Sequence, residues 1–144
     1  MGSSYLLDTN TASYIVRVNP AVTLDHLARV SIEQTAISTV TEAELLFNLV
    51  RQPQAKQLWA LTGEFLARVA ILPWDSNAAR RYSHLRAELE ASGKPLGTLD
   101  TMIAAQALAE DLVLASSDYA FRRVPRLKLE DWTLPLHGKP VNAP

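Results

Sequence analysis

The sequence predicts an α/β domain in which a mainly parallel β-sheet is covered by α-helices on both faces. Short apolar runs alternate along the chain with longer segments of helical periodicity, which is the pattern of parallel strands joined by crossover helices. The 144 residues, 48% of them hydrophobic, are enough for one domain with a substantial core. Internal repeats and low-complexity segments, which would indicate other architectures, do not occur in the sequence.

The expected strands are short apolar segments. Strands that are buried on both faces are apolar throughout rather than alternating, and the fourth segment, LVLAS, is the clearest example. In chain order the expected strands are 5–7, 34–38, 69–74, 112–116 and 127–131.

The expected helices lie between these strands and have recognisable ends. Pro20 stops the first helix and suits the first position of the second. Ser38 or Thr39 caps the third, and Asp75 or Ser76 caps the fifth. We expect one domain over residues 1–134, followed by an extended tail over 135–144. The expected helices are 10–18, 21–29, 39–50, 54–69, 75–92 and 99–110.

Composition excludes several classes of protein. The net charge of −1 argues against a polybasic protein that coats nucleic acid, although a local basic rim is compatible with it. The absence of cysteine excludes disulfides, thiolate metal sites and cysteine nucleophiles. No apolar run is long enough to span a membrane, and the start of the chain does not resemble a secretion signal, so we expect a cytoplasmic protein with no membrane partner.

Four acids are the candidate functional residues. Asp8 follows the first expected strand and Asp118 the fourth, at the edge where ligands bind parallel sheets. Glu44 and Asp100 lie near the starts of helices. Each acid alone has a structural explanation as a cap or first-turn residue, and Glu44 could close a capping box with Thr41. Taken together, the carboxylates would suit a hard divalent cation that assists phosphodiester hydrolysis.

Five motifs, in this order and spacing, resemble those of PIN-domain ribonucleases, and specifically the VapC toxins of VapBC toxin–antitoxin pairs. They are LLDTN, ISTVTEAEL, GKPLGTLDTMIAAQAL, LVLASSDYAFRRV and LKLEDW, and the resemblance covers residues 5–132. It implies a PIN-like three-layer fold and a metal-dependent endoribonuclease, a hydrolase that cuts structured RNA, often tRNA, with an activated water and inhibits translation.

The resemblance also implies roles for individual residues. Asp8, Glu44, Asp100 and Asp118 would be the catalytic, metal-binding acids for Mg²⁺, which Mn²⁺ can replace. Supporting polar positions would be Thr9, Asn10 and Ser116, and we expect RNA contacts from Arg122, Arg123 and Lys94.

Expected partners follow from the same resemblance. They are a cognate VapB-type antitoxin, a second copy of the chain in a homodimer, and a larger toxin–antitoxin complex. Trp59 and Phe65 would suit contact with an antitoxin helix, although core packing is the default for such side chains.

One alternative function stays open, and others conflict with the sequence. A PIN-domain nuclease of RNA processing or decay, rather than a toxin, remains open. A haloacid-dehalogenase phosphatase is disfavoured, because it needs Asp-x-Asp and this chain has Asn10 at the second position. A receiver domain is disfavoured because it needs an early pair of acids, which this chain lacks. A binding scaffold without activity is disfavoured by the presence of Asp8, Glu44 and Asp100 together. The three histidines share no metal-ligand spacing.

Overall fold

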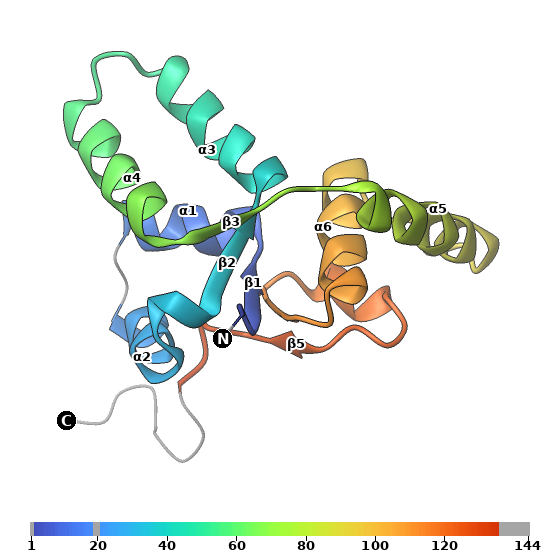
Figure 1. Ribbon diagram of the computed structural model, residues 1–144. Coiled ribbons are helices and arrows are strands. Elements are labelled where there is room, and N and C mark those ends of the chain that lie inside the picture. The colour runs from blue at the N-terminus through green and yellow to red at the C-terminus, as the bar shows by residue number, and fades with distance from the viewer. Residues whose placement is uncertain (1, 19–20, 136–144) are drawn as a thin grey trace.

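The structure, a computed structural model, describes residues 2–18 and 21–135. Within these ranges a single parallel sheet has the strand order β3-β2-β1-β4-β5. Because all neighbouring strands run in the same direction, their carboxyl ends lie at one edge of the sheet (Figure 1). The strands are β1 (Tyr5–Leu7), β2 (Thr35–Ser38), β3 (Ala70–Leu72), β4 (Val113–Ala115) and β5 (Leu129–Glu130).

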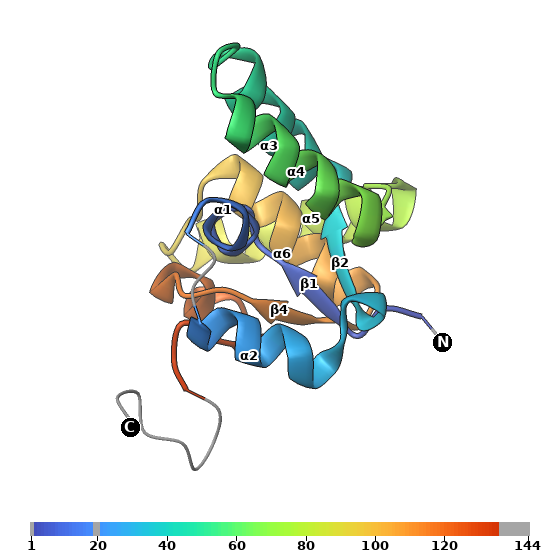
Figure 2. The same ribbon diagram turned by 90° about the vertical axis from the view of Figure 1, so that its left-hand side faces the viewer.

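Helices cover both faces of the sheet. The α5 and α6 helices lie side by side against one face, and α1, α2 and α4 pack against the other, while α3 and α4 form a hairpin that projects from the sheet (Figures 1 and 2). Two short 3₁₀ helices, η1 (Ile32–Gln34) and η2 (Tyr119–Arg123), complete the described chain. The α-helices are α1 (Thr9–Arg17), α2 (Ala21–Val30), α3 (Thr39–Val50), α4 (Lys56–Arg68), α5 (Ser76–Ala91) and α6 (Thr98–Ala109).

The hydrophobic core is divided by the sheet. Successive side chains of a strand point to opposite faces, so Leu6 joins the cluster beneath α5 and α6 while Leu7 joins the cluster beneath α1, α2 and α4. Ala36 and Ile37 of β2 divide in the same way, as do Leu114 and Ala115 of β4. The apolar strands of the sequence are thus explained by burial on both sides, and the sheet holds its carboxyl edge rigidly.

The predicted α/β class and the expected strands and helices are confirmed, with ends shifted by one or two residues. The capping box between Thr41 and Glu44 is wrong, because Ser38 is the N-cap of α3 and accepts a hydrogen bond from the Val40 N–H at 3.0 Å. Thr41 therefore lies inside the helix, one turn too late to cap it. Phe65 is buried in the core and is not available as a surface contact.

The last described residues pack against α2. Trp132 is fully buried and stacks on the His26 ring, with centroids 5.7 Å apart. The Thr23 hydroxyl donates to the Trp132 carbonyl at 2.9 Å. Most of the expected tail, residues 136–144, lies outside the described residues, and the domain boundary at 134 stays a prediction. None of the helices described is both long and apolar enough to cross a membrane.

Candidate active site

Asp8 is the first residue beyond β1, at the centre of the carboxyl edge. It is almost fully buried and is the N-cap of α1, where its Oδ1 accepts a hydrogen bond from the Thr11 N–H at 2.8 Å. Its Oδ2 accepts a hydrogen bond from the Ser116 hydroxyl at 2.6 Å. Each carboxylate oxygen has a second lone pair, so capping does not use up the capacity of Asp8 to bind another group.

Ser116 and Asp118 come from the turn after β4, the strand beside β1. The buried Ser116 hydroxyl donates to Asp8 and also accepts a hydrogen bond from the Asp118 N–H at 3.0 Å. Asp118 is the N-cap of η2 and accepts from the Ala120 N–H at 2.9 Å. One hydroxyl therefore connects the acids that follow the two central strands.

Asp100 lies in the first turn of α6 and completes the group of acids. Partial burial raises the pKa of Asp100, and the charges of Asp118 and then Asp8 raise it further. Burial likewise raises the pKa of Asp8, with a smaller contribution from Asp118, against the lowering effect of the hydrogen bonds from Ser116 and Thr11. We call Asp8, Asp100 and Asp118 the acid cluster, because the charge of Asp118 raises the pKa of both other acids.

The acid cluster has the chemistry of a divalent-cation site. Its donors are carboxylate oxygens, which hard cations such as Mg²⁺ prefer, and none of the ion pairs among the described residues involves these acids. The donor set therefore fits a metal. In the described parts of the chain, however, no three acidic or histidine side chains stand at metal-ligand separations. The capping hydrogen bonds of Asp8 and Asp118 hold those carboxylates against the helices that they cap. That these acids bind a metal ion therefore stays a prediction.

Glu44 is not part of the acid cluster. It is half-buried on α3, and its charge is not among those that shift the pKa of Asp8 or Asp100. Its helix is nevertheless tied to the edge of the sheet, because the fully buried Thr41 hydroxyl hydrogen-bonds the Thr9 hydroxyl at 3.0 Å. Thr41 is therefore a supporting residue that sequence reasoning assigned to the wrong role.

The predicted polar and basic positions have different surroundings. Asn10 is exposed and lines a separate pocket of about 250 Å³ with Thr11, Tyr14 and Ser117. Lys94 is exposed in the loop before α6. Arg122 and Arg123 lie in different surroundings, because Arg122 lines the pocket beside Asp118 and Arg123 does not.

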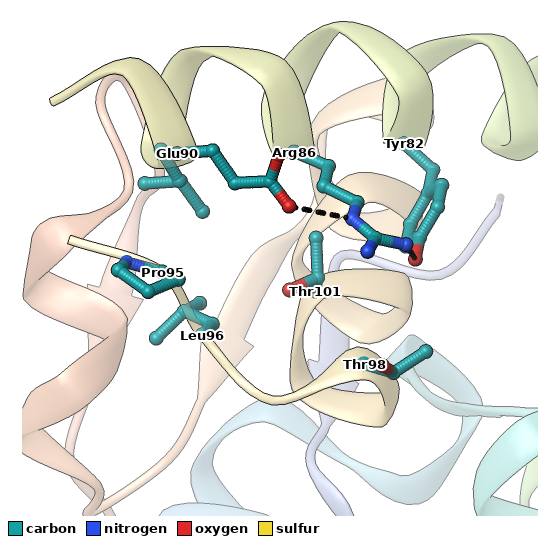
Figure 3. A pocket seen from close by; sticks show the side chains of 8 residues that line it. Tyr82, Arg86, Glu90, Pro95, Leu96, Thr98 and Thr101 are labelled. Atoms are coloured by element: carbon teal, nitrogen blue, oxygen red, sulfur yellow. Dashed lines mark hydrogen bonds and ion pairs between the residues drawn. The ribbon is translucent and has the colours of Figure 1, made fainter. Parts of the chain in front are cut away.

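Another pocket, of about 220 Å³, lies between α5 and the start of α6 (Figure 3). Thr98 and Thr101, which flank Asp100 in the sequence, line it together with Arg86. The Arg86 guanidinium is bound to the Glu90 carboxylate at 3.0 Å and to the Tyr82 hydroxyl at 3.1 Å. The charge of Arg86 is therefore already balanced, and none of the acids of the acid cluster lines this pocket.

Comparison with known proteins assigns the family. Residues 5–127 match the sequence profile of the PIN domain. Ribonuclease VapC2 of Rickettsia felis is 32% identical over 130 residues, covering 89% of this chain and 97% of the relative. The tRNA(fMet)-specific endonuclease VapC of Salmonella typhimurium is 30% identical over 132 residues, with the same coverage of 89% and 97%.

Comparison with solved structures points to the same family. The DNA-bound VapBC structure from Salmonella typhimurium superposes with a TM-score of 0.85 at 29% identity. VapBC2 from Rickettsia felis, bound to a promoter DNA fragment, gives a TM-score of 0.81 at 30% identity. Each alignment covers 90% of this chain and 98% of the other. With the parallel sheet and the acids at its carboxyl edge, the chain belongs to the PIN-domain family and, within it, to the VapC ribonucleases.

Proposed function

We propose that this protein is a metal-dependent endoribonuclease that acts as the toxin of a toxin–antitoxin pair. The observation that carries the proposal is the acid cluster at the carboxyl edge of the sheet. Ser116 bridges Asp8 and the Asp118 backbone, and the charges of Asp118 and Asp8 raise the pKa of Asp100. None of these acids forms an ion pair with the described residues. Clustered carboxylates repel one another, and a divalent cation would relieve the repulsion. Cytoplasmic RNA is the substrate that this activity would meet.

Asp8, Asp100 and Asp118 would hold the metal, with Glu44 as a further candidate from α3. Mg²⁺ is the proposed ion, with Mn²⁺ able to replace it, and when bound such an ion activates water and stabilises charge on the phosphate oxygens. Ser116 keeps the Asp8 carboxylate in one orientation through its 2.6 Å hydrogen bond. The Thr11 N–H holds the other Asp8 oxygen, so the carboxylate is fixed before any ligand binds.

The proposed substrate is a structured RNA, and tRNA is the first candidate. Two relatives, from Salmonella typhimurium and Shigella flexneri, are named as tRNA(fMet)-specific endonucleases. Arg122, Arg123 and Lys94 are exposed basic residues that we assign to RNA phosphate contacts. Cleavage of such an RNA would inhibit translation. The alternative is a nuclease of RNA processing or decay with the same chemistry.

The proposed partners are a VapB-type antitoxin and a second copy of the chain, joined in a larger toxin–antitoxin complex. The structurally similar VapBC proteins support the antitoxin. Exposed large apolar side chains on the α3–α4 hairpin support a protein contact there, because apolar side chains that gather on a surface mark an interaction site. They are Leu46, Phe47, Val50, Trp59 and Leu61.

The test is RNA cleavage by protein prepared without antitoxin. Total small RNA is incubated with Mg²⁺, with Mn²⁺ and with EDTA, and fragment ends are sequenced. We expect discrete fragments that need metal and are lost in Asp8→Asn and Asp100→Asn. Asp75→Asn is the matched control, because Asp75 is also a helix N-cap, at 3.1 Å from the Ala78 N–H, but lies outside the acid cluster.

Two results would decide against the proposal. If folded, metal-loaded protein leaves every RNA intact, the endonuclease proposal fails. If it cuts RNA but its expression leaves incorporation of labelled amino acids unchanged in cells, the RNA-processing alternative replaces the toxin role.

A further inference from the structure

An exposed aromatic ring stands directly beside the acid cluster. Tyr119 follows Asp118 in the sequence and is 69% exposed, at the start of η2. The Arg122 side chain lies over this ring, with its guanidinium carbon 4.3 Å from the ring centre. An arginine stacked on an aromatic ring presents flat, polarisable surfaces of the kind on which nucleic acid bases stack.

Arg122 differs from the basic residues that follow it. The Arg123 guanidinium donates to the Pro95 carbonyl at 3.0 Å, Arg126 pairs with Glu88 at 3.1 Å, and Lys128 pairs with Asp111 at 2.9 Å. Of this group, Arg122 alone has neither a carboxylate nor a carbonyl partner within the described residues. Its positive charge therefore remains available to a ligand.

The ring and the acids share a pocket. A small concave site of about 80 Å³ is lined by Ser116, Asp118, Tyr119 and Arg122, together with Ser117, Leu129 and Asp131. Ser116 donates to Asp8, so this pocket reaches the residues that hold the acid cluster. An RNA strand whose phosphate lies at the acids would bring a neighbouring base to Tyr119 and Arg122.

We propose that Tyr119 and Arg122 form a stacking subsite for an unpaired base of the RNA substrate, next to the bond that is cut. The inference rests on the proposed function and names the part of the substrate that this site holds. Stacking is tolerant of base identity, because every base has a flat face, so the subsite selects an unpaired nucleotide rather than a sequence. Its loss corresponds to about a 5- to 150-fold weaker RNA affinity.

The first measurement separates binding from chemistry. The RNA that the parent protein cuts in the cleavage test above is the probe, with KM and kcat measured in the active protein and Kd measured in the Asp8→Asn background. Tyr119→Ala is expected to raise KM and Kd by about 5- to 150-fold with little change in kcat. Tyr119→Phe keeps the ring and is expected to match the parent protein.

The arginine is tested by salt dependence. A phosphate contact contributes about 0.7 to the slope of log Kd against log salt concentration for single-stranded nucleic acid, so Arg122→Ala should lower the slope by that amount. Arg68→Ala is the control, because Arg68 ends α4 just before β3 and so lies at the opposite, amino edge of the parallel sheet. Tyr119→Ala should leave the slope unchanged.

The remaining test changes the RNA instead of the protein. Oligonucleotides that each carry one abasic position near the cut should show one position at which base removal weakens binding to the parent protein but not to Tyr119→Ala. If the parent protein cuts no RNA, the proposed function fails. If it cuts RNA and Tyr119→Ala retains the parent KM, only the stacking subsite fails. Weaker antitoxin binding with unchanged RNA affinity would assign Tyr119 to the protein partner and overturn the inference.

Discussion

Replacing Ser116 by alanine is the sharpest perturbation of the site that leaves every acid in place. The Ser116 hydroxyl is 2.6 Å from Asp8 Oδ2 and 3.0 Å from the Asp118 N–H, and the residue is 5% exposed. Alanine removes the only hydrogen bond to that carboxylate oxygen found among the described residues, and also the partner of the Asp118 N–H. A hydrogen bond to a charged group contributes about 1.5–3 kcal/mol, so the free energy of unfolding should fall by about that amount.

The expected decrease in Tm is about 3–12 °C, because each kcal/mol corresponds to roughly 2–4 °C in a chain of this size. The loss of unfolding free energy caused by Ser116→Ala should also depend on pH. The bond from Ser116 lowers the pKa of Asp8, so its stabilisation is present while Asp8 is ionised and declines as the pH falls through the pKa of Asp8. We expect the difference between parent and Ser116→Ala to be largest at neutral pH and to shrink in acid.

Thermal unfolding in EDTA between neutral and acidic pH measures both effects. Ser117→Ala is the matched control, because Ser117 is the next residue, is exposed and makes no side-chain hydrogen bond with the described residues, so its effect should stay within about 0.5 kcal/mol. A double-mutant cycle with Asp8→Asn should show coupling between the two sites. Equal stability of Ser116→Ala and Ser117→Ala at neutral pH would refute the reasoning.

Three other perturbations have definite expected outcomes. Asp100→Asn should raise the free energy of unfolding at pH 7 in EDTA, because the raised pKa of Asp100 means that its ionised form destabilises the folded state. The gain should be no more than about 1 kcal/mol, since solvent screens a half-buried group, and it should vanish below the ordinary pKa of an aspartate. A lower Tm than that of the parent protein at pH 7 would contradict this prediction. The same variant should lose the metal-induced stabilisation of the parent, about 2.7 kcal/mol at 100 times the dissociation constant, in thermal scans with and without Mg²⁺. Thr41→Val breaks the hydrogen bond to Thr9 and should lower the free energy of unfolding by about 1 kcal/mol, measured by urea unfolding. Thr41→Ser keeps this hydrogen bond. Equal unfolding midpoints for the two variants would exclude a role for the hydroxyl. Trp132→Ala should cost about 3–5 kcal/mol, because the ring is buried against His26 and Tyr5, and circular dichroism showing an unchanged midpoint would be inconsistent with that packing.

The fold was predictable because its signals are local. Apolar runs such as 112–116 and helix ends such as Pro20 stand in the sequence itself. The two 3₁₀ helices were missed because three to five residues carry no periodicity. The second strand and the third helix meet at Ser38, where several hydroxyl residues occur in succession, and sequence alone did not decide which of them caps the helix.

The site was predictable in part. That Asp8 and Asp118 fall at one edge follows from strand order in any parallel sheet. That Ser116 joins them depends on β4 lying beside β1, a pairing between segments more than a hundred residues apart that no local pattern specifies. The exposed ring of Tyr119 has no sequence signal beyond its position after Asp118, because tyrosine is intermediate between the residue types that are usually buried and those that are usually exposed.

The strand order also determines when this enzyme can first become active during its own synthesis. The central strand β1 is made first, but its neighbour β4 and the Ser116 hydroxyl that fixes Asp8 are separated from it by most of the chain. Asp100 and Asp118 also emerge late. A ribosome that is translating the message therefore carries an incomplete site until the final third of the domain has left it, and chains released early contain Asp8 without the residues that hold it.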